Sequence, residues 1–122
     1  MISKIDLRET LDLPILETST AVETFQNQTL RPILKLQNDI YLSLLHAYSV
    51  RQKTDLTALS KDKKRIFIEQ SLQKDLVLKN TFIGITIGMF TSEELENYSL
   101  DNKEYNRRII TMLIERIKSQ NL

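Results

Sequence analysis

Apolar residues recur at helical spacing along most of this 122-residue chain. From Ser19 onward they fall three to five positions apart, beginning with Val22 and Phe25. Such spacing places them on one face of an amphipathic helix. We therefore predict a long first helix over residues 20–51, with the hydroxyl of Ser19 or Thr20 as its N-cap.

Pro32 interrupts this first pattern. Proline removes a backbone donor, clashes with the carbonyl group four residues earlier and disfavours α-helical geometry at the preceding residue. The sequence therefore predicts a kink or a break near residues 28–31, with Thr29 as a candidate second cap. Residues 52–60 show weak periodicity and are predicted to form a connection with room for a short turn of helix.

A second apolar series extends from residue 62 to about residue 90 and predicts a second long helix. Its end, residues 81–90, is rich in β-branched and aromatic side chains, which leaves a strand as the alternative. We favour the helix because a lone strand in a helical chain would have no partner for its backbone groups. Gly84 and Gly88 share one helical face, where they predict close packing of another helix, within one subunit or across a dimer axis.

The clearest boundary signal is Thr91–Glu94, which has the S/T-x-x-E spacing of a capping box. It predicts that one helix ends here and that a short helix follows over residues 92–99. Asp101 is then placed to cap a last helix over residues 102–119. Glu104 and Arg108 form an i,i+4 pair within it, worth about 0.3 kcal/mol.

Residues 1–18 differ from the rest because their apolar residues alternate with polar ones and with Pro14. This pattern predicts an extended N-terminal arm, which packs along its own bundle or along a partner chain. The predicted fold is all-α: a small helical bundle of three long helices and one short helix, in a single domain over residues 19–122, preceded by the arm.

The composition agrees with this fold class. Leu, Ile, Val and Phe make up 40 of 122 residues, about a third, which is enough for a folded core. Two Gly and two Pro are too few for an all-β fold, and the absence of Cys excludes disulfide bonds and thiolate chemistry. Charged residues interrupt the N-terminus, and the longest charge-free run, residues 80–92, is shorter than the ~20 residues of a membrane-spanning helix. We therefore expect a cytoplasmic protein with no membrane partner.

The formal net charge of +1 is far from the basic balance of a dedicated nucleic-acid-binding protein. The densest charge run is a basic cluster at the start of the second predicted helix, which consists of Lys61, Lys63, Lys64 and Arg65. A solvated surface cluster is the simpler interpretation. The alternative is contact with nucleic acid or another polyanion, assisted by Arg107 and Arg108.

Metal and phosphate chemistry have little support in the sequence. His46 is the sole histidine, and Ser43 stands where a Glu-x-x-His motif would place its glutamate. We interpret His46 as a surface or boundary residue. Gly84 and Gly88 are not followed by the Lys and Ser/Thr of a phosphate-binding loop. No metal, cofactor or catalytic residue is predicted, and the balance is against an enzyme without closing that question.

Several amides interrupt the apolar neighbourhoods of the predicted helices. Gln37 and Asn38 stand close to Tyr41 in the first helix, and Asn80 lies in the second. Buried amides are costly unless they are hydrogen-bonded, so these four side chains define a candidate polar pocket. The alternative is that they lie half exposed at the edges of the apolar stripes.

The segments 24–38 (TFQNQTLRPILKLQN) and 105–110 (YNRRII) resemble a family of short helical proteins from flavobacteria and their relatives. The resemblance covers roughly residues 20–119. Members are sometimes labelled glyoxalase, which implies a paired βαβββ fold with a metal held by His and Glu residues. One histidine, two glycines and no strand-rich pattern contradict that label here. The resemblance implies a shared helical fold and a cytoplasmic location, and no mechanism.

These features predict a non-enzymatic helical module with an interaction or structural role. Three helices leave apolar surface uncovered, and a homodimer is an economical way to bury it. A further protein partner is compatible with this prediction. The alternatives are a nucleic-acid-associated protein that uses the Lys61–Arg65 cluster, and a bundle that binds a small ligand.

Overall fold

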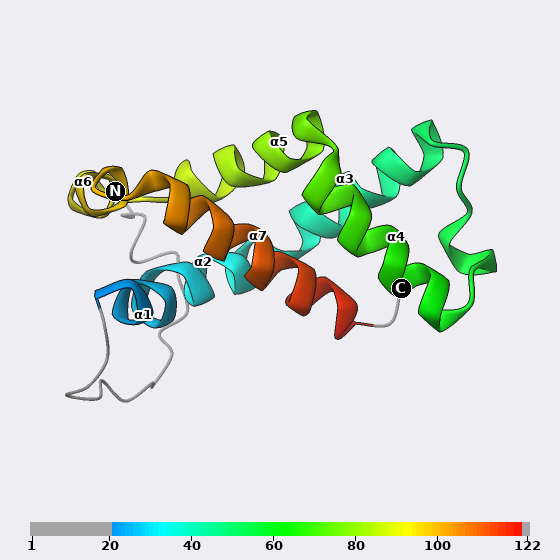
Figure 1. Cartoon of the computed structure of the whole chain (residues 1–122), viewed down its shortest axis with the longest axis horizontal. Helices are drawn as coiled ribbons and strands as arrows, with labels where there is room; N and C mark the ends of the chain where they lie inside the picture. Colours follow the sequence, from blue (N-terminus) through cyan, green and yellow to red (C-terminus); the bar gives the residue numbers. More distant parts are fainter. Residues whose placement is uncertain (1–20, 121–122) are drawn as a thin grey trace.

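The computed structural model describes residues 21–120, and these form helices without any strand (Figure 1). In chain order the elements are α1 (Ala21–Phe25), the π-helical segment η1 (Gln26–Leu30), α2 (Arg31–Leu36), α3 (Asn38–Arg51), the 3-10 helix η2 (Leu56–Ala58), α4 (Lys61–Lys74), α5 (Leu76–Ile87), α6 (Ser92–Ser99) and α7 (Asn102–Lys118). The all-α prediction is confirmed for this part of the chain. The predicted N-terminal arm lies outside the described residues.

The irregularity predicted near residues 28–31 is a π-helical turn and not a break. Arg31 has helical φ and ψ of −56° and −48°, and its amide donates to the carbonyl oxygen of Gln26, five residues earlier. Proline at the next position has no amide to donate, and the wider π-turn lets the chain enter α2 as a helix. The helix is interrupted later, at Gln37, whose φ and ψ are −97° and 13°.

Thr29 is not a helix cap, so that prediction is wrong. Its side chain is buried, and its hydroxyl donates to Oε2 of Glu94 at 3.0 Å. The residue therefore joins η1 to α6, which is a contact between segments 65 positions apart in the sequence.

The single helix predicted over residues 62–90 is also wrong, because α4 ends at Lys74 and α5 begins at Leu76. Between them Asp75 is extended, with φ −85° and ψ 107°, and its carboxylate accepts from the amide of Leu78 at 3.0 Å. A short acidic side chain that bonds a nearby amide competes with the helical backbone pattern. Residues 81–87 are helical, so the strand alternative is excluded.

Three further boundary predictions are confirmed, and the predicted N-cap at Ser19 or Thr20 lies outside the described residues. Thr91 and Glu94 form both hydrogen bonds of the capping box at the start of α6. The carboxylate of Asp101 accepts from the amide of Glu104 at the start of α7, and the 52–60 connection contains the short helix η2.

The core lies where α7 packs against α4 and α5. Ile109, Leu113 and Ile117 of α7 are fully buried. Near the start of α7 an aromatic cluster packs α1 against the bundle. The ring centres of Phe25 in α1 and Tyr105 in α7 are 4.6 Å apart. No helix within residues 21–120 is both long and apolar enough to cross a membrane.

Candidate functional site

A groove of about 850 Å³ lies between α7 and the segment formed by η1 and α2. We call it the basic groove, because five of its eleven lining residues are cationic: Arg31, Lys35, Arg107, Arg108 and Arg116. Glu115 is the one acidic residue in its lining. The apolar lining consists of Leu34, which is buried, and Met112, which is half-buried. The groove thus combines a small apolar floor with a positive rim.

Both ends of the basic groove are spanned by hydrogen bonds between the helices. At one end Nη1 of Arg108 donates to Oε1 of Gln26 at 2.9 Å. At the other end Nε of Arg116 donates to Oδ1 of Asn38 at 3.1 Å, and Asn38 also exchanges two hydrogen bonds with Gln120.

These contacts define the length and direction of the groove. Residues 26 and 38 face residues 108 and 116 in the same order, so η1–α2 and α7 run in the same direction. Eight residues of helix separate the two arginines on α7, which corresponds to about 12 Å.

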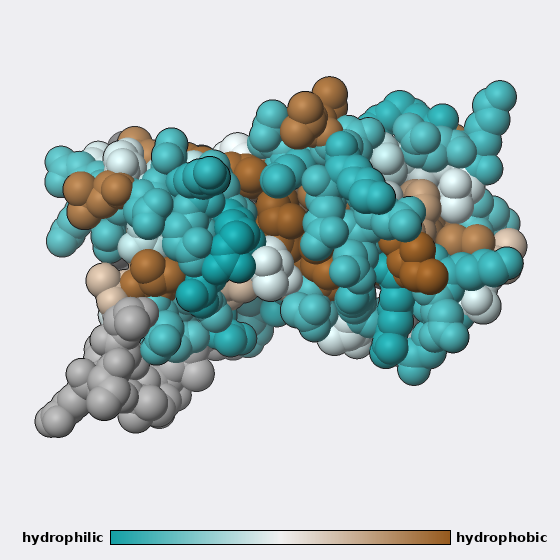
Figure 2. Space-filling model, in the orientation of Figure 1, coloured by the Kyte–Doolittle hydropathy of each residue, from teal (hydrophilic) through white to brown (hydrophobic). Residues whose placement is uncertain are grey.

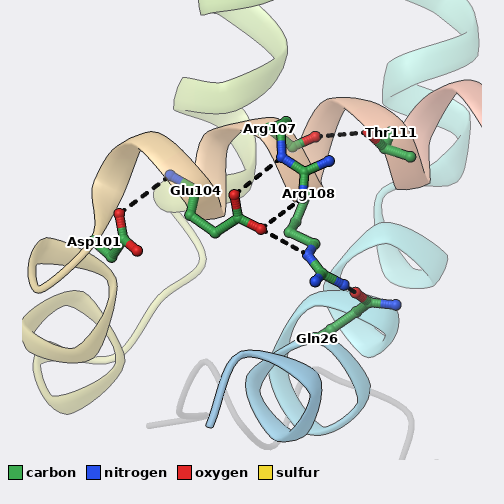
Figure 3. Close-up of polar contacts among 6 residues, drawn as sticks. All are labelled: Gln26, Asp101, Glu104, Arg107, Arg108 and Thr111. Carbon is green, nitrogen blue, oxygen red and sulfur yellow. Dashed lines mark hydrogen bonds and ion pairs between the residues drawn. The ribbon is translucent and has the colours of Figure 1, made fainter. Parts of the chain in front are cut away.

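Glu104 orients two of the arginines (Figure 3). Its Oε1 accepts from Nη2 of Arg107 at 2.6 Å and from Nε of Arg108 at 3.1 Å, and its Oε2 accepts from Nε of Arg107 at 3.0 Å. The i,i+4 pair predicted from the sequence is therefore present, together with an i,i+3 pair. The amide of Glu104 donates to the carboxylate of Asp101, which fixes the first turn of α7. In this position the Glu104 carboxylate holds the Arg108 guanidinium, which in turn donates to Gln26.

We expect the carboxyl group of Glu104 to have a pKa well below that of an ordinary glutamate. Hydrogen bonds from Arg107 and then Arg108 lower its pKa from 4.5 to about 2. A carboxylate with a depressed pKa contributes stability above the unfolded-state pKa, and this contribution is lost as the pH falls through the folded-state value. The loss should therefore occur between about pH 4.5 and about pH 2. A carboxyl NMR titration measures the pKa directly.

Two arginine variants test the cause of this shift. Arg107→Gln and Arg108→Gln should each raise the pKa of Glu104, whereas Arg116→Gln, which removes a cation at the far end of α7, should leave it unchanged. An unshifted Glu104 in the unmodified protein would contradict the pairing.

The four residues of the predicted polar pocket do not converge. Gln37 and Tyr41 are buried, Asn38 spans the end of the basic groove, and Asn80 is exposed on α5. Asn80 instead lines a second groove of about 710 Å³ between α5 and α7. Only Gln37 and Tyr41 meet, because Gln37 is directed toward α5, whereas the next residue, Asn38, bonds Gln120 and Arg116.

Gln37 and Tyr41 belong to a closed chain of hydrogen bonds inside the bundle. The hydroxyl of Thr86 donates its hydrogen to the carbonyl oxygen of Phe82 at 2.9 Å, so the Tyr41 hydroxyl is the donor in its 2.7 Å contact with Thr86. Nε2 of Gln37 donates to the Tyr41 oxygen at 3.3 Å and to the carbonyl oxygen of Ile85 at 3.2 Å. Burial raises the pKa of Tyr41. These groups satisfy one another and hold α3 against α5.

The basic cluster of α4 is separate from the basic groove. Lys61, Lys63 and Arg65 are exposed, and Lys64 is half-buried. None of these four residues lines the basic groove. Arg107 and Arg108, which the sequence analysis grouped with them as polyanion contacts, do line it.

Three further residues singled out in the sequence lie away from the groove. His46 is exposed on α3, and residues 21–120 contain no group of three His, Asp or Glu side chains placed to hold a metal ion. The close packing predicted at Gly84 does not occur among residues 21–120, where a Cβ atom at this position would meet nothing within 4 Å. At Gly88 the nearest atoms belong to the backbone of α5 itself. Both glycines are exposed, and none of the other described helices packs against them.

Sequence reasoning missed Arg31, Lys35 and Arg116 as members of one site. The available signal was their spacing, since Arg31 and Lys35 are i,i+4 neighbours and Arg108, Met112 and Arg116 repeat every four residues.

Comparison of this chain with protein-family models, curated proteins and solved structures gave no match.

Proposed function

We propose that this chain is a non-enzymatic interaction module whose basic groove binds an acidic protein segment that also carries apolar side chains. The observation behind the proposal is the arrangement of five cations around Leu34 and Met112 between two helices. Cations on the rim attract and orient an acidic partner, and the apolar floor contributes burial.

The chemistry of the lining favours a protein segment over nucleic acid. None of the eleven lining residues is aromatic, so the groove offers no platform on which bases stack. A nucleic-acid-binding surface also tends to shift the net charge of a small protein, and this chain has +1.

The openness of the groove favours a chain segment over a small ligand. Six of the lining residues are exposed: Arg31, Lys35, Arg107, Thr111, Glu115 and Ser119. Sites for small molecules bury most of the ligand surface, which this open rim does not do. A segment that lies along the groove would span the distance between the Gln26–Arg108 and Asn38–Arg116 contacts.

Fluorescence anisotropy with a labelled peptide of alternating Glu and Leu residues tests the proposal on the full chain. We expect binding that weakens as salt is raised. Arg31→Glu should weaken it by about tenfold, or ~1.4 kcal/mol. Arg65→Glu makes the same change in net charge on α4, outside the groove, and should have little effect.

The outcomes separate the alternatives. A peptide with Lys in place of Glu should not bind, and equal binding of the two peptides would refute recognition by charge. Tighter binding of a single-stranded oligonucleotide, abolished by Arg65→Glu and not by Arg31→Glu, would instead support the basic cluster of α4 as a nucleic-acid site.

A further inference from the structure

The outer face of α5 is exposed and carries no charge. Leu76 and Val77 at its start are 68% and 76% exposed. The other exposed positions along it are Asn80, Thr81, Gly84 and the C-cap Gly88. Figure 2 shows hydrophobic surface at the corner where α4 meets α5, at the top of the view. This face of α5 is uncharged along its whole length.

The neighbouring helices show how unusual this face is for a surface helix. The exposed positions of α4 include the charged residues Lys61, Asp62, Lys63, Arg65, Glu69 and Lys74. Those of α7 include Lys103, Arg107 and Glu115. Charged residues normally occupy the solvent side of an amphipathic helix, so their absence from the exposed positions of α5, where Lys79 is half-buried, points to a contact with another protein surface.

The shape of the face is complementary to itself. Large apolar side chains project at its start, and at Gly84, seven residues after Val77, no atom of the other described residues lies within 4 Å of a Cβ position. If two α5 helices pack antiparallel about an axis between Asn80 and Thr81, positions 77 and 84 lie opposite each other, because both are equally far from that axis. Val77 of each subunit then meets Gly84 of the other, which is the reciprocal contact that a two-fold interface requires.

We infer that the outer face of α5 is the interface of a two-fold homodimer, with Val77 packed against Gly84 of the partner subunit. A second copy is favoured over an unrelated partner because the complementary features lie on one helix. The adjacent groove between α5 and α7 agrees with this, since its lining carries the cations Lys79, Lys103 and Arg107 together with the acidic Asp101 and Glu104. A surface with charges of both signs is able to pair with its own copy.

Light scattering after size exclusion tests the interface with a matched pair of valines. Val77 and Val50 are both largely exposed, at 76% and 62%, and lie on different helices. The unmodified full chain should elute as a dimer. Val77→Lys should shift it to the monomer, and Val50→Lys should leave it dimeric. A monomeric unmodified chain, or a dimer that survives Val77→Lys, would overturn the inference.

Gly84→Arg separates loss of the interface from loss of the fold. Among the described residues a Cβ atom at Gly84 meets nothing within 4 Å, so the variant should keep its helical circular dichroism spectrum while it becomes monomeric. A folded Gly84→Arg variant that stays dimeric would exclude this face.

Cross-linking reports the antiparallel geometry itself. The chain has no cysteine, so Asn80→Cys introduces a single thiol next to the proposed axis. Under mild oxidation it should form a disulfide-linked dimer much faster than Gln70→Cys, which places a thiol at an exposed position of α4. Equal rates for the two variants would contradict the proposed axis.

Discussion

Phe82→Ala is expected to cost about 3–5 kcal/mol of unfolding free energy, the largest effect predicted for this protein. The side chain of Phe82 is fully buried, and its ring packs edge-on at 5.6 Å from that of Tyr41. Its removal leaves a cavity between α3 and α5, beside the hydrogen-bond chain of Tyr41 and Thr86. Since small domains have about 5–15 kcal/mol of stability, a large part of the total would be lost.

Urea denaturation followed by circular dichroism measures this change. Phe67→Ala is the control, because Phe67 is half-buried and packs against Tyr48 at 6.0 Å near the surface. We expect a clearly smaller loss for Phe67→Ala. Equal losses for the two variants would contradict the full burial of Phe82 beside Tyr41.

Glu94→Ala should cost about 2 kcal/mol, the second largest effect, because one carboxylate serves two parts of the fold. Its Oε1 accepts from the amide of Thr91 at 2.9 Å and completes the capping box. Its Oε2 accepts from the buried hydroxyl of Thr29 at 3.0 Å. The alanine variant removes the cap and leaves a buried hydroxyl without this acceptor.

The adjacent residue provides the control for this prediction. Glu93 lies in the same first turn of α6 and is exposed, so Glu93→Ala removes the same charge and should cost only a few tenths of a kcal/mol. Thr29→Val should recover part of the Glu94→Ala loss when the two are combined, because the buried hydroxyl is then gone. Additive losses in thermal denaturation would show that Thr29 and Glu94 are not coupled.

Local sequence determined the helical class and most of the helix ends. The capping box at Thr91 and Glu94 and the cap at Asp101 depend on side chains that bond amides three residues away. Helical spacing of apolar residues likewise selects one face, and the buried series Ile109, Leu113 and Ile117 follows it. Such features need no distant partner, and the pattern of residues alone predicts them.

The errors occurred where two local preferences compete. The apolar series of residues 62–90 predicted one continuous helix, but Asp75 interrupts it. Its carboxylate accepts from the amide of Leu78, so α4 ends and α5 begins at this residue. Pro32 predicted a kink or a break, and the irregularity is instead a π-helical turn, because the amide of Arg31 donates to Gln26, one residue further back than in an α-helix. In both places the packing of the flanking helices selects between backbone arrangements that are close in local energy.

The two candidate interaction surfaces were decided by tertiary structure. Arg31 and Lys35 line the same groove as Arg108 and Arg116 only because η1–α2 and α7 run in the same direction and are bridged at both ends. The uncharged face of α5 was recognisable as a surface only once Phe82 and Ile83 were seen to occupy its buried side. Residue spacing specifies which side chains share a helix face, and the packing of distant helices decides which faces meet and which remain open.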